Sequence, residues 1–216
     1  LARDGDGIAE IDWSVGQLTT TLDRLGLRDN TLIVFMSDNG PWLPFKRNGG
    51  SAGLLRGGKG SNWEGGQRVP CIAKWPARIP KNQVCREVAT TMDMLPTLAA
   101  ITGSELSKQR PIDGHDVRDL LFGRAAAKSK TEHFLYYTSK GDLHGIRRGP
   151  WKLKLKPLEL FQIEHDVSEQ WDVKKQNQAL VAELKDLAVA LDAEITAAAR
   201  PTRRVSELQF DPSKLK

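Results

Sequence analysis

Hydrophobic residues recur every three or four positions near the start of the chain, at Ile8, Ile11, Val15, Leu18, Leu22 and Leu25. This spacing predicts an amphipathic helix that Gly26 can end. The next apolar run, Leu32 to Met36, is continuous and partly β-branched, which is typical of a strand buried on both faces of a parallel sheet. A helix followed by a buried strand indicates an α/β arrangement.

The periodicity is lost over residues 37–66, where glycine accumulates. We expect a long loop there, and loops of this length are usually functional or disordered. Val69 to Trp75 has the pattern of a second buried strand. The leucine and isoleucine spacing over residues 90–101 predicts a helix that Gly103 ends, and the α/β layer is expected to close near Leu121.

A different pattern follows a small, basic segment at 124–130, which we interpret as a linker. Residues 151–156 alternate apolar residues with lysine, and this period of two predicts an antiparallel strand with one face in water. Residues 158–163 are its expected partner after a turn at Pro157. An apolar stripe from Leu180 to Ile195 then predicts a helix before Pro201.

Composition and charge exclude several classes of protein. The 216 residues are 39% hydrophobic and 27% charged, which argues against a disordered or fibrous chain. The net charge of +5 is spread along the sequence, so no basic stripe for nucleic acid is present, and we expect no nucleic-acid partner. No apolar stretch is long enough for a membrane-spanning helix, and residues 1–10 lack the pattern of a signal peptide.

Two cysteines leave the compartment open. Cys71 and Cys85 can form one disulfide or stay as thiols, and neither state identifies an oxidising environment. Because Cys71 lies in an apolar run, we expect a buried, inert thiol.

The first candidate site is Ser37-Asp38-Asn39-Gly40, directly after the first strand. Ligands of α/β sheets bind beyond the carboxyl ends of strands, where Asp38 and Asn39 would lie. Their oxygens suit Ca²⁺ or Mg²⁺, provided that further oxygen ligands come from elsewhere. These residues alone leave open a simple tight turn, because Asn-Gly is a common turn dipeptide.

The second candidate site is the glycine-rich run from Gly53 to Ser61, which carries Lys59. Glycines allow close approach of the backbone, and the lysine supplies a point charge for a tetrahedral oxyanion. The run nearly matches a nucleotide-binding P-loop, but Gly60 replaces the required Ser or Thr and no strand leads into it. An anion-binding loop and a flexible surface loop therefore remain as alternatives.

Five segments taken together resemble the type I sulfatases, which are arylsulfatase-like, in order and in spacing. They are residues 12–16 (DWSVG), 37–40 (SDNG), 54–60 (LLRGGKG), 63–70 (WEGGQRVP) and 93–98 (DMLPTL). Shorter pieces continue the resemblance at residues 111–114, 134–137, 147–153 and 160–163. The resemblance covers residues 1 to about 195.

The resemblance implies an α/β fold: part of an alkaline-phosphatase-like sandwich, with a small C-terminal antiparallel sheet plus helix subdomain. On this basis residues 1–125 form the C-terminal portion of a sulfatase catalytic domain. Residues 131–200 form the sheet and helix subdomain, and 201–216 form a tail.

The resemblance also implies roles for the candidate residues. Asp38 and Asn39 would be Ca²⁺ ligands. Lys59 would contact the sulfate ester and offset charge on the sulfuryl oxygens and the departing alkoxide, an effect that is strongest in a dry site. Glu64 and Arg68 are assigned to loop architecture.

One departure from the family concerns its nucleophile, a formylglycine made from the Cys or Ser of a C/S-x-P/A-x-R signature. Neither Cys71-Ile72-Ala73-Lys74 nor any serine of the chain matches it. By the resemblance, the nucleophile, the other Ca²⁺ ligands and the leaving-group acid would precede Leu1. We therefore expect the C-terminal half of a sulfatase, inactive alone, whose partner is the N-terminal half of the same natural polypeptide.

The expected function is calcium-dependent hydrolysis of a sulfate ester, in a small molecule or a sulfated glycan. Two alternatives remain: a phosphodiesterase of the same superfamily, and a non-catalytic protein that keeps the sulfatase fold. The residues do not indicate a compartment, and the resemblance implies a periplasmic or extracellular one. Trp42, Phe45, Lys46 and Arg47 would line a pocket for an anionic sugar or an aryl group, or lie in an exposed loop.

Overall fold

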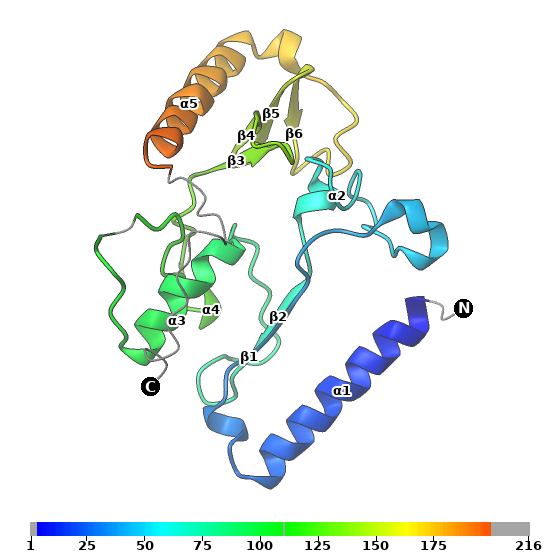
Figure 1. The fold of residues 1–216 in the computed structure, drawn as a ribbon, viewed down its shortest axis with the longest axis vertical. Helices are drawn as coiled ribbons and strands as arrows, with labels where there is room; N and C mark the ends of the chain where they lie inside the picture. The colour runs from blue at the N-terminus through cyan, green and yellow to red at the C-terminus, as the bar shows by residue number, and fades with distance from the viewer. Residues whose placement is uncertain (1–3, 110, 200–216) are drawn as a thin grey trace, which may run out of the picture.

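The computed structural model describes residues 4–109 and 111–199. The helices are α1 (Asp4–Arg24), α2 (Glu64–Gln67), α3 (Met94–Thr102), α4 (Arg118–Leu121) and α5 (Gln178–Ala197). The strands are β1 (Ile33–Met36), β2 (Cys71–Lys74), β3 (His133–Tyr137), β4 (Leu143–Arg148), β5 (Trp151–Leu155) and β6 (Leu158–Gln162). Figure 1 shows the C-terminal sheet and α5 at one end, with the β1–β2 pair in the middle of the molecule.

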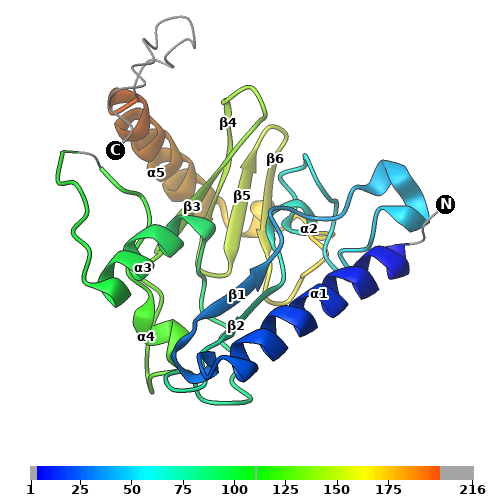
Figure 2. The same ribbon diagram turned by 60° about the horizontal axis from the view of Figure 1, so that its bottom comes forward.

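The first predicted helix is confirmed as α1, and the chain leaves it through Gly26 in the left-handed conformation. It lies at the edge of the molecule, beyond β1 and β2 as seen from the C-terminal sheet (Figures 1 and 2). Its apolar stripe stays open to solvent, with Ile8, Ile11 and Leu18 exposed by half or more of their surface. An amphipathic pattern predicts the helix but not what covers it.

The two strands predicted for the α/β layer exist, but their expected environment was wrong. β1 and β2 pair with each other antiparallel, Ile33 opposite Lys74 and Met36 opposite Cys71, rather than as parallel strands. Neither strand is buried on both faces, because Phe35 and Ile72 are exposed. A continuous apolar run is compatible with either strand direction, so it does not predict how the strand pairs.

The expected burial of Cys71 was also wrong. Cys71 and Cys85 are both exposed free thiols. Cys71 lies at the start of β2, where it, Ile72 and Lys74 are all exposed.

The predicted helix at 90–101 is confirmed as α3, preceded by a 3₁₀ turn η3 (Thr91–Asp93). Asp93 joins this turn to the segment before α4, since its carboxylate accepts hydrogen bonds from the backbone N–H groups of Thr90 (2.6 Å) and His115 (2.7 Å). Gly103 ends α3 in the left-handed conformation.

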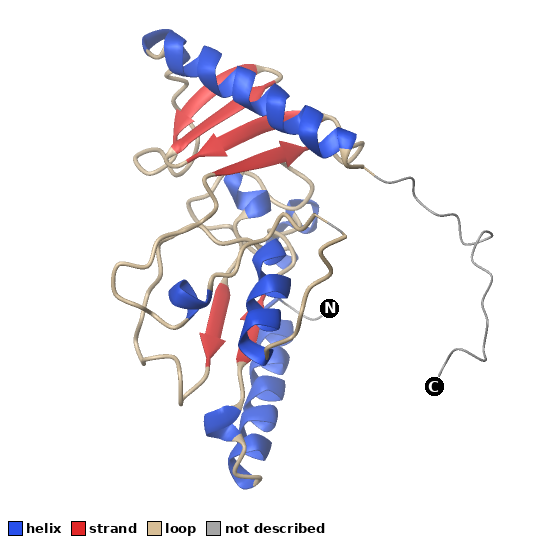
Figure 3. Ribbon diagram, turned by 90° about the vertical axis from the view of Figure 1, so that its left-hand side faces the viewer, coloured by secondary structure: helices blue, strands red, loops and turns tan. Residues whose placement is uncertain are grey.

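The C-terminal antiparallel sheet is confirmed, with strand order β3-β4-β5-β6. Figure 3 shows α5 lying across one face of it. The core between them contains Ile146, Leu153, Leu160, Leu184 and Ala188, all fully buried. Alternate residues of each strand therefore face α5, as a period of two requires.

The other face of this sheet was expected to be wet, and this was wrong. Lys152 and Lys154 on β5 are only 1% and 5% exposed. The glycine-rich loop and α2 cover this face, where Trp63 and Glu64 contact the two lysines. A lysine stripe indicates solvent only when no acidic segment covers it.

None of the helices among residues 4–109 and 111–199 could cross a lipid bilayer. The domain limits at 125 and 131 stay a prediction.

Candidate functional site

Two loops meet beyond the β1–β2 pair, and they carry the predicted site residues. The backbone N–H of Lys59 donates to the carbonyl of Pro41 (2.8 Å), and that of Gly40 donates to Gly66 (3.2 Å). A β-carbon on Gly40 would overlap the carbonyl of Gly65, and one on Gly58 would overlap that of Pro41. The glycines are therefore required by backbone packing between the loops.

The predicted metal ligands lie in the first of these loops. Asn39 Nδ2 donates to Asp38 Oδ2 (2.6 Å), and the Ser37 hydroxyl donates to the Asn39 carbonyl (2.8 Å). Asp38 is exposed and Asn39 is half-buried. Hard oxygen donors fit a Ca²⁺ ion, which takes six to eight of them. The described residues contain no cluster of three or more His, Cys, Asp or Glu side chains able to hold a metal, so this pair would form only part of a shell.

Lys59 lies at the tip of the second loop and is exposed. Its ammonium is 5.9 Å from the centre of the Trp42 ring. No carboxylate in the described part of the chain forms an ion pair with it. The structure thus brings the loop of Lys59 to the loop of Asp38 and Asn39, while their roles as anion and metal ligands stay predictions.

An aromatic pair stands beside these loops. The Trp42 and Phe45 rings have centroids 4.4 Å apart, and each residue is about half exposed. Trp42 directly precedes the turn η2 (Leu43–Asn48), and Phe45 lies within it. The backbone N–H of Trp42 donates to the carbonyl of Gly49 (2.9 Å), which closes this turn.

A separate hollow lies near the N-terminal end of α3. It has a volume of about 400 Å³ and is lined by Met92, Leu95, Leu106, Ser107, Pro111, Ile112, Asp113 and Gly114. Among the described residues its lining contains no cation for an anionic substrate, so we do not assign the site to it.

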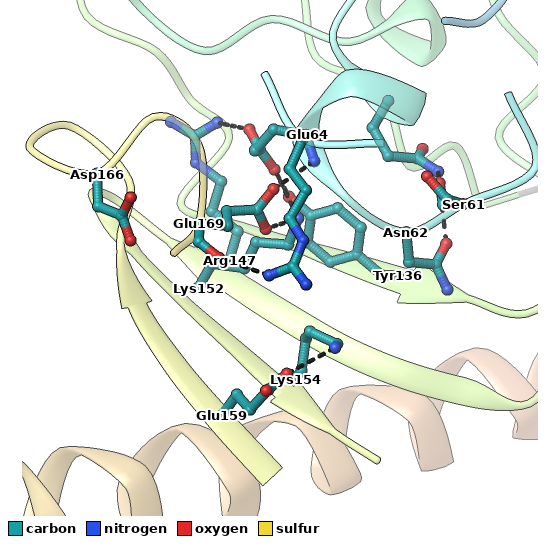
Figure 4. Close-up of polar contacts among 12 residues, drawn as sticks. Ser61, Asn62, Glu64, Tyr136, Arg147, Lys152, Lys154, Glu159, Asp166 and Glu169 are labelled. Carbon is teal, nitrogen blue, oxygen red and sulfur yellow. Dashed lines mark hydrogen bonds and ion pairs between the residues drawn. The ribbon is translucent and has the colours of Figure 1, made fainter. Parts of the chain in front are cut away.

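The sequence did not predict a buried ion cluster beneath the glycine-rich loop (Figure 4). The Lys152 ammonium lies 2.9 Å from Glu64 Oε1 and 2.8 Å from Glu169 Oε1. Glu64 Oε1 also accepts from the Tyr136 hydroxyl (2.8 Å), and Glu64 Oε2 accepts from Arg147 (3.4 Å). Glu64, Lys152 and Glu169 are all 1% exposed or less.

The pKa values of the two carboxylates in the cluster are shifted in opposite directions. Burial raises the pKa of Glu64, but Lys152, Tyr136 and Arg147 outweigh it and hold the pKa below its ordinary value. For Glu169, burial dominates over Lys152 and raises the pKa. Burial, together with the adjacent Glu64 carboxylate, raises the pKa of Tyr136 well above its ordinary value.

Trp63 extends the cluster along β5. The Arg56 guanidinium and the Lys154 ammonium each lie 3.7 Å from the centre of its ring, and Phe161 meets it edge to face at 5.8 Å. Lys154 is neutralised by Glu159 at 2.7 Å. The only sequence signals for these contacts were the lysines of β5 and the acidic residue within Trp63-Glu64-Gly65-Gly66, and spacing could not pair them.

These features define a class of protein. Residues 1–104, just under half of the chain, match the Sulfatase family. This match supports a fragment of a sulfatase-family protein. The fold is accordingly part of an alkaline-phosphatase-like α/β sandwich with a small C-terminal antiparallel sheet and helix, as predicted.

Particular relatives support this assignment. The chain is similar to steryl-sulfatase of Mus musculus, with 43% identity over 149 residues, covering 66% of this chain and 23% of that protein. It is 41% identical to arylsulfatase A of Homo sapiens over 152 residues, which are 68% of this chain and 29% of that protein. The chain thus spans about a quarter of the length of these relatives.

Solved structures of sulfatases have a fold similar to that of this chain. The PsFucS1 sulfatase from Pseudoalteromonas sp. superposes with a TM-score of 0.81 at 26% identity, over 91% of this chain and 44% of that one. Ps i-CgsB in complex with k-i-k-neocarrahexaose superposes with a TM-score of 0.74 at 32% identity, over 84% of this chain and 41% of that one.

Proposed function

We propose that this chain supplies the part of a calcium-dependent sulfatase that carries two Ca²⁺ ligands and the cation for the sulfate group. The match to this family makes sulfate-ester hydrolysis the expected chemistry. The observation that supports this role for these residues is the pair of backbone hydrogen bonds that holds the Lys59 loop against the Asp38–Asn39 loop.

Each residue would have a distinct task. The Lys59 ammonium, which no described carboxylate neutralises, would bind the sulfuryl oxygens and stabilise charge on the departing alkoxide. Asp38 and Asn39 would supply part of the ligand shell of a Ca²⁺ ion. When bound, this ion would polarise an oxygen of the substrate. Neutral oxygen from Asn39 beside the Asp38 carboxylate suits this hard cation.

The nucleophile must come from another segment, because none of the 216 residues lies in a C/S-x-P/A-x-R signature. The proposal is therefore that the chain alone does not turn over substrate and works with the N-terminal half of the same polypeptide. The uncovered apolar side chains of α1 and of the β1–β2 pair support such a partner, since large exposed apolar patches mark interfaces. A periplasmic or extracellular location is proposed on the resemblance alone.

The substrate is proposed to be a sulfate ester of a small molecule or a glycan. The half-exposed Trp42–Phe45 pair, with Lys59 above the Trp42 ring, offers a flat apolar surface beside a cation. Such a surface can accept either an aryl group or the face of a sugar.

The test begins with the coding DNA that precedes Leu1. An in-frame C/S-x-P/A-x-R signature there supports the enzyme, and the extended polypeptide is then assayed with p-nitrophenyl sulfate and p-nitrophenyl phosphate. Lys59→Ala is expected to lower sulfate-ester turnover by about 10²-fold or more. Unchanged turnover would exclude Lys59 from the site, and preference for the phosphate ester would favour a phosphodiesterase.

A further inference from the structure

The glycine-rich loop is attached at both of its ends to the C-terminal subdomain, through strand β5 and the segment that follows β6. Near its start, the Ser168 hydroxyl donates to the carbonyl of Leu54 (2.6 Å), and Arg56 donates to the carbonyl of Glu169 (2.7 Å). At its end, the backbone N–H of Glu64 donates to the Glu169 carboxylate (2.7 Å), and the Glu64 side chain enters the ion cluster. Lys59 lies between these two attachments.

Hydrogen bonds within the loop connect its attached ends to the turn that contains Lys59. Gly65 N–H donates to the carbonyl of Arg56 (2.8 Å), which closes the loop at its base. Ser61 closes the turn around Lys59, because its N–H donates to the Gly58 carbonyl (3.0 Å) and its side chain bonds to the same residue. These hydrogen bonds link the residues on both sides of Lys59 to the attached ends of the loop.

The anchor is polar where an apolar contact would serve stability equally well. Buried ion pairs gain little net stability over hydrophobic packing, because both charges lose their hydration. Unlike apolar packing, these contacts depend on direction. Lys152 contacts two carboxylates at once, and Glu64 contacts Lys152, Tyr136 and Arg147. A buried polar network in which each member shares several partners restricts the positions that the loop can take.

We infer that Glu64, Lys152 and Glu169 are positioning residues, which set the place of Lys59 relative to the Asp38–Asn39 loop. Two of the three lie outside the part of the chain that matches the Sulfatase family. The C-terminal sheet would thus act on the site at a distance, through the loop it holds. This inference rests on the function proposed for Lys59.

Amide hydrogen exchange of the 216-residue chain tests the anchor without any substrate. The Lys59 N–H reports on contact with the Asp38–Asn39 loop, because Pro41 is its acceptor. In Lys152→Met, exchange at Lys59 and Gly65 is expected to rise about tenfold or more through local opening. Low concentrations of urea should leave this local exchange nearly unchanged, whereas amides of the β4–β5 pair exchange through global unfolding and should respond to urea.

Two further variants keep the test decisive. Arg148→Met is the matched control, because Arg148 also lies in the sheet but pairs with the exposed Glu183 on α5; it should leave the loop amides unchanged. Glu64→Gln, which keeps the shape of the side chain, replaces Lys152→Met if that variant does not fold. Unchanged exchange in the loop, or loop exchange that depends on urea as strongly as that of the β4–β5 pair, would overturn the inference.

A kinetic readout separates this inference from the proposed function. In the polypeptide that carries the nucleophile, Lys152→Met should lower kcat by up to about 10²-fold through misplacement of Lys59, with Lys152→Arg recovering part of it. If Lys59→Ala lowers kcat and Lys152→Met does not, the positioning role is wrong. If the loop opens in Lys152→Met but Lys59→Ala has no kinetic effect, the anchor stands and the function proposed for Lys59 fails.

Discussion

The buried cluster predicts a large loss of stability when its central cation is removed. Lys152→Met keeps the length of the side chain but leaves Glu64 and Glu169 without the ammonium that lies 2.9 and 2.8 Å from their oxygens. It also removes the cation 4.3 Å from the Tyr136 ring centre. Two carboxylates would then share a site that excludes water, and at neutral pH one must take up a proton.

The size of the effect follows from burial. All three charged groups are 1% exposed or less, so water cannot replace the lost partner. Breaking a buried pair on one side typically costs about 3 to 5 kcal/mol of the free energy of unfolding. Arg148→Met breaks an ion pair in solvent, so its free energy of unfolding should stay close to that of the parent.

Urea denaturation followed by circular dichroism measures these free energies, with the m-value as a check that the same structure unfolds. The triple variant Glu64→Gln, Lys152→Met, Glu169→Gln should be more stable than Lys152→Met alone, because no fully buried charge is then left unpaired. Arg147, which loses the Glu64 carboxylate, is partly exposed to solvent. A triple variant that is as unstable as Lys152→Met, or less stable, would refute the electrostatic explanation and indicate lost packing instead.

Further predictions address other contacts. Both tyrosines of the chain should be silent near pH 10 in an absorbance titration of the folded protein: Tyr136 is buried beside Glu64, and burial with the Asp192 hydrogen bond raises the pKa of Tyr137 to about 12. Folding stability should fall as pH rises from about 10 towards 12, since the unfolded chain releases these protons first; a transition at pH 10 without unfolding would contradict this. Gly58→Ala should destabilise the chain by about 1 to 3 kcal/mol in the same urea assay, because its β-carbon overlaps the Pro41 carbonyl, whereas Gly16→Ala in α1 has free space and should not. Asp38→Ala should weaken Ca²⁺ binding by the extended polypeptide in calorimetry, and an unchanged affinity would remove Asp38 from the metal shell.

Local patterns predicted the regular elements well. The stripe from Ile8 to Leu25, the stop at Gly103 and the alternation in β5 depend on neighbours within a few residues, and each element is present. The pairing direction of β1 could not be predicted, because it depends on where the chain returns about 40 residues later.

The burial of side chains and the contacts of the site were harder to predict from the sequence, because both depend on residues far away along the chain. The Lys152 ammonium meets a carboxylate 88 positions earlier in the chain, so its alternation with leucine was interpreted as a wet face. The glycines of the two loops did indicate close backbone approach, and the structure shows this contact. The Ca²⁺ and sulfate roles of Asp38, Asn39 and Lys59 came from resemblance and stay predictions.

Strand β5 runs between two interiors of opposite character, hydrocarbon against α5 and paired charge against the glycine-rich loop. A shift of one residue in the register of β5 would exchange its two faces. The lysine ammonium groups would then lie in the apolar core against α5, and the leucines would lie among the carboxylates. A register shift is therefore unfavourable on both faces of β5. The apolar core and the ion cluster each favour the same strand register.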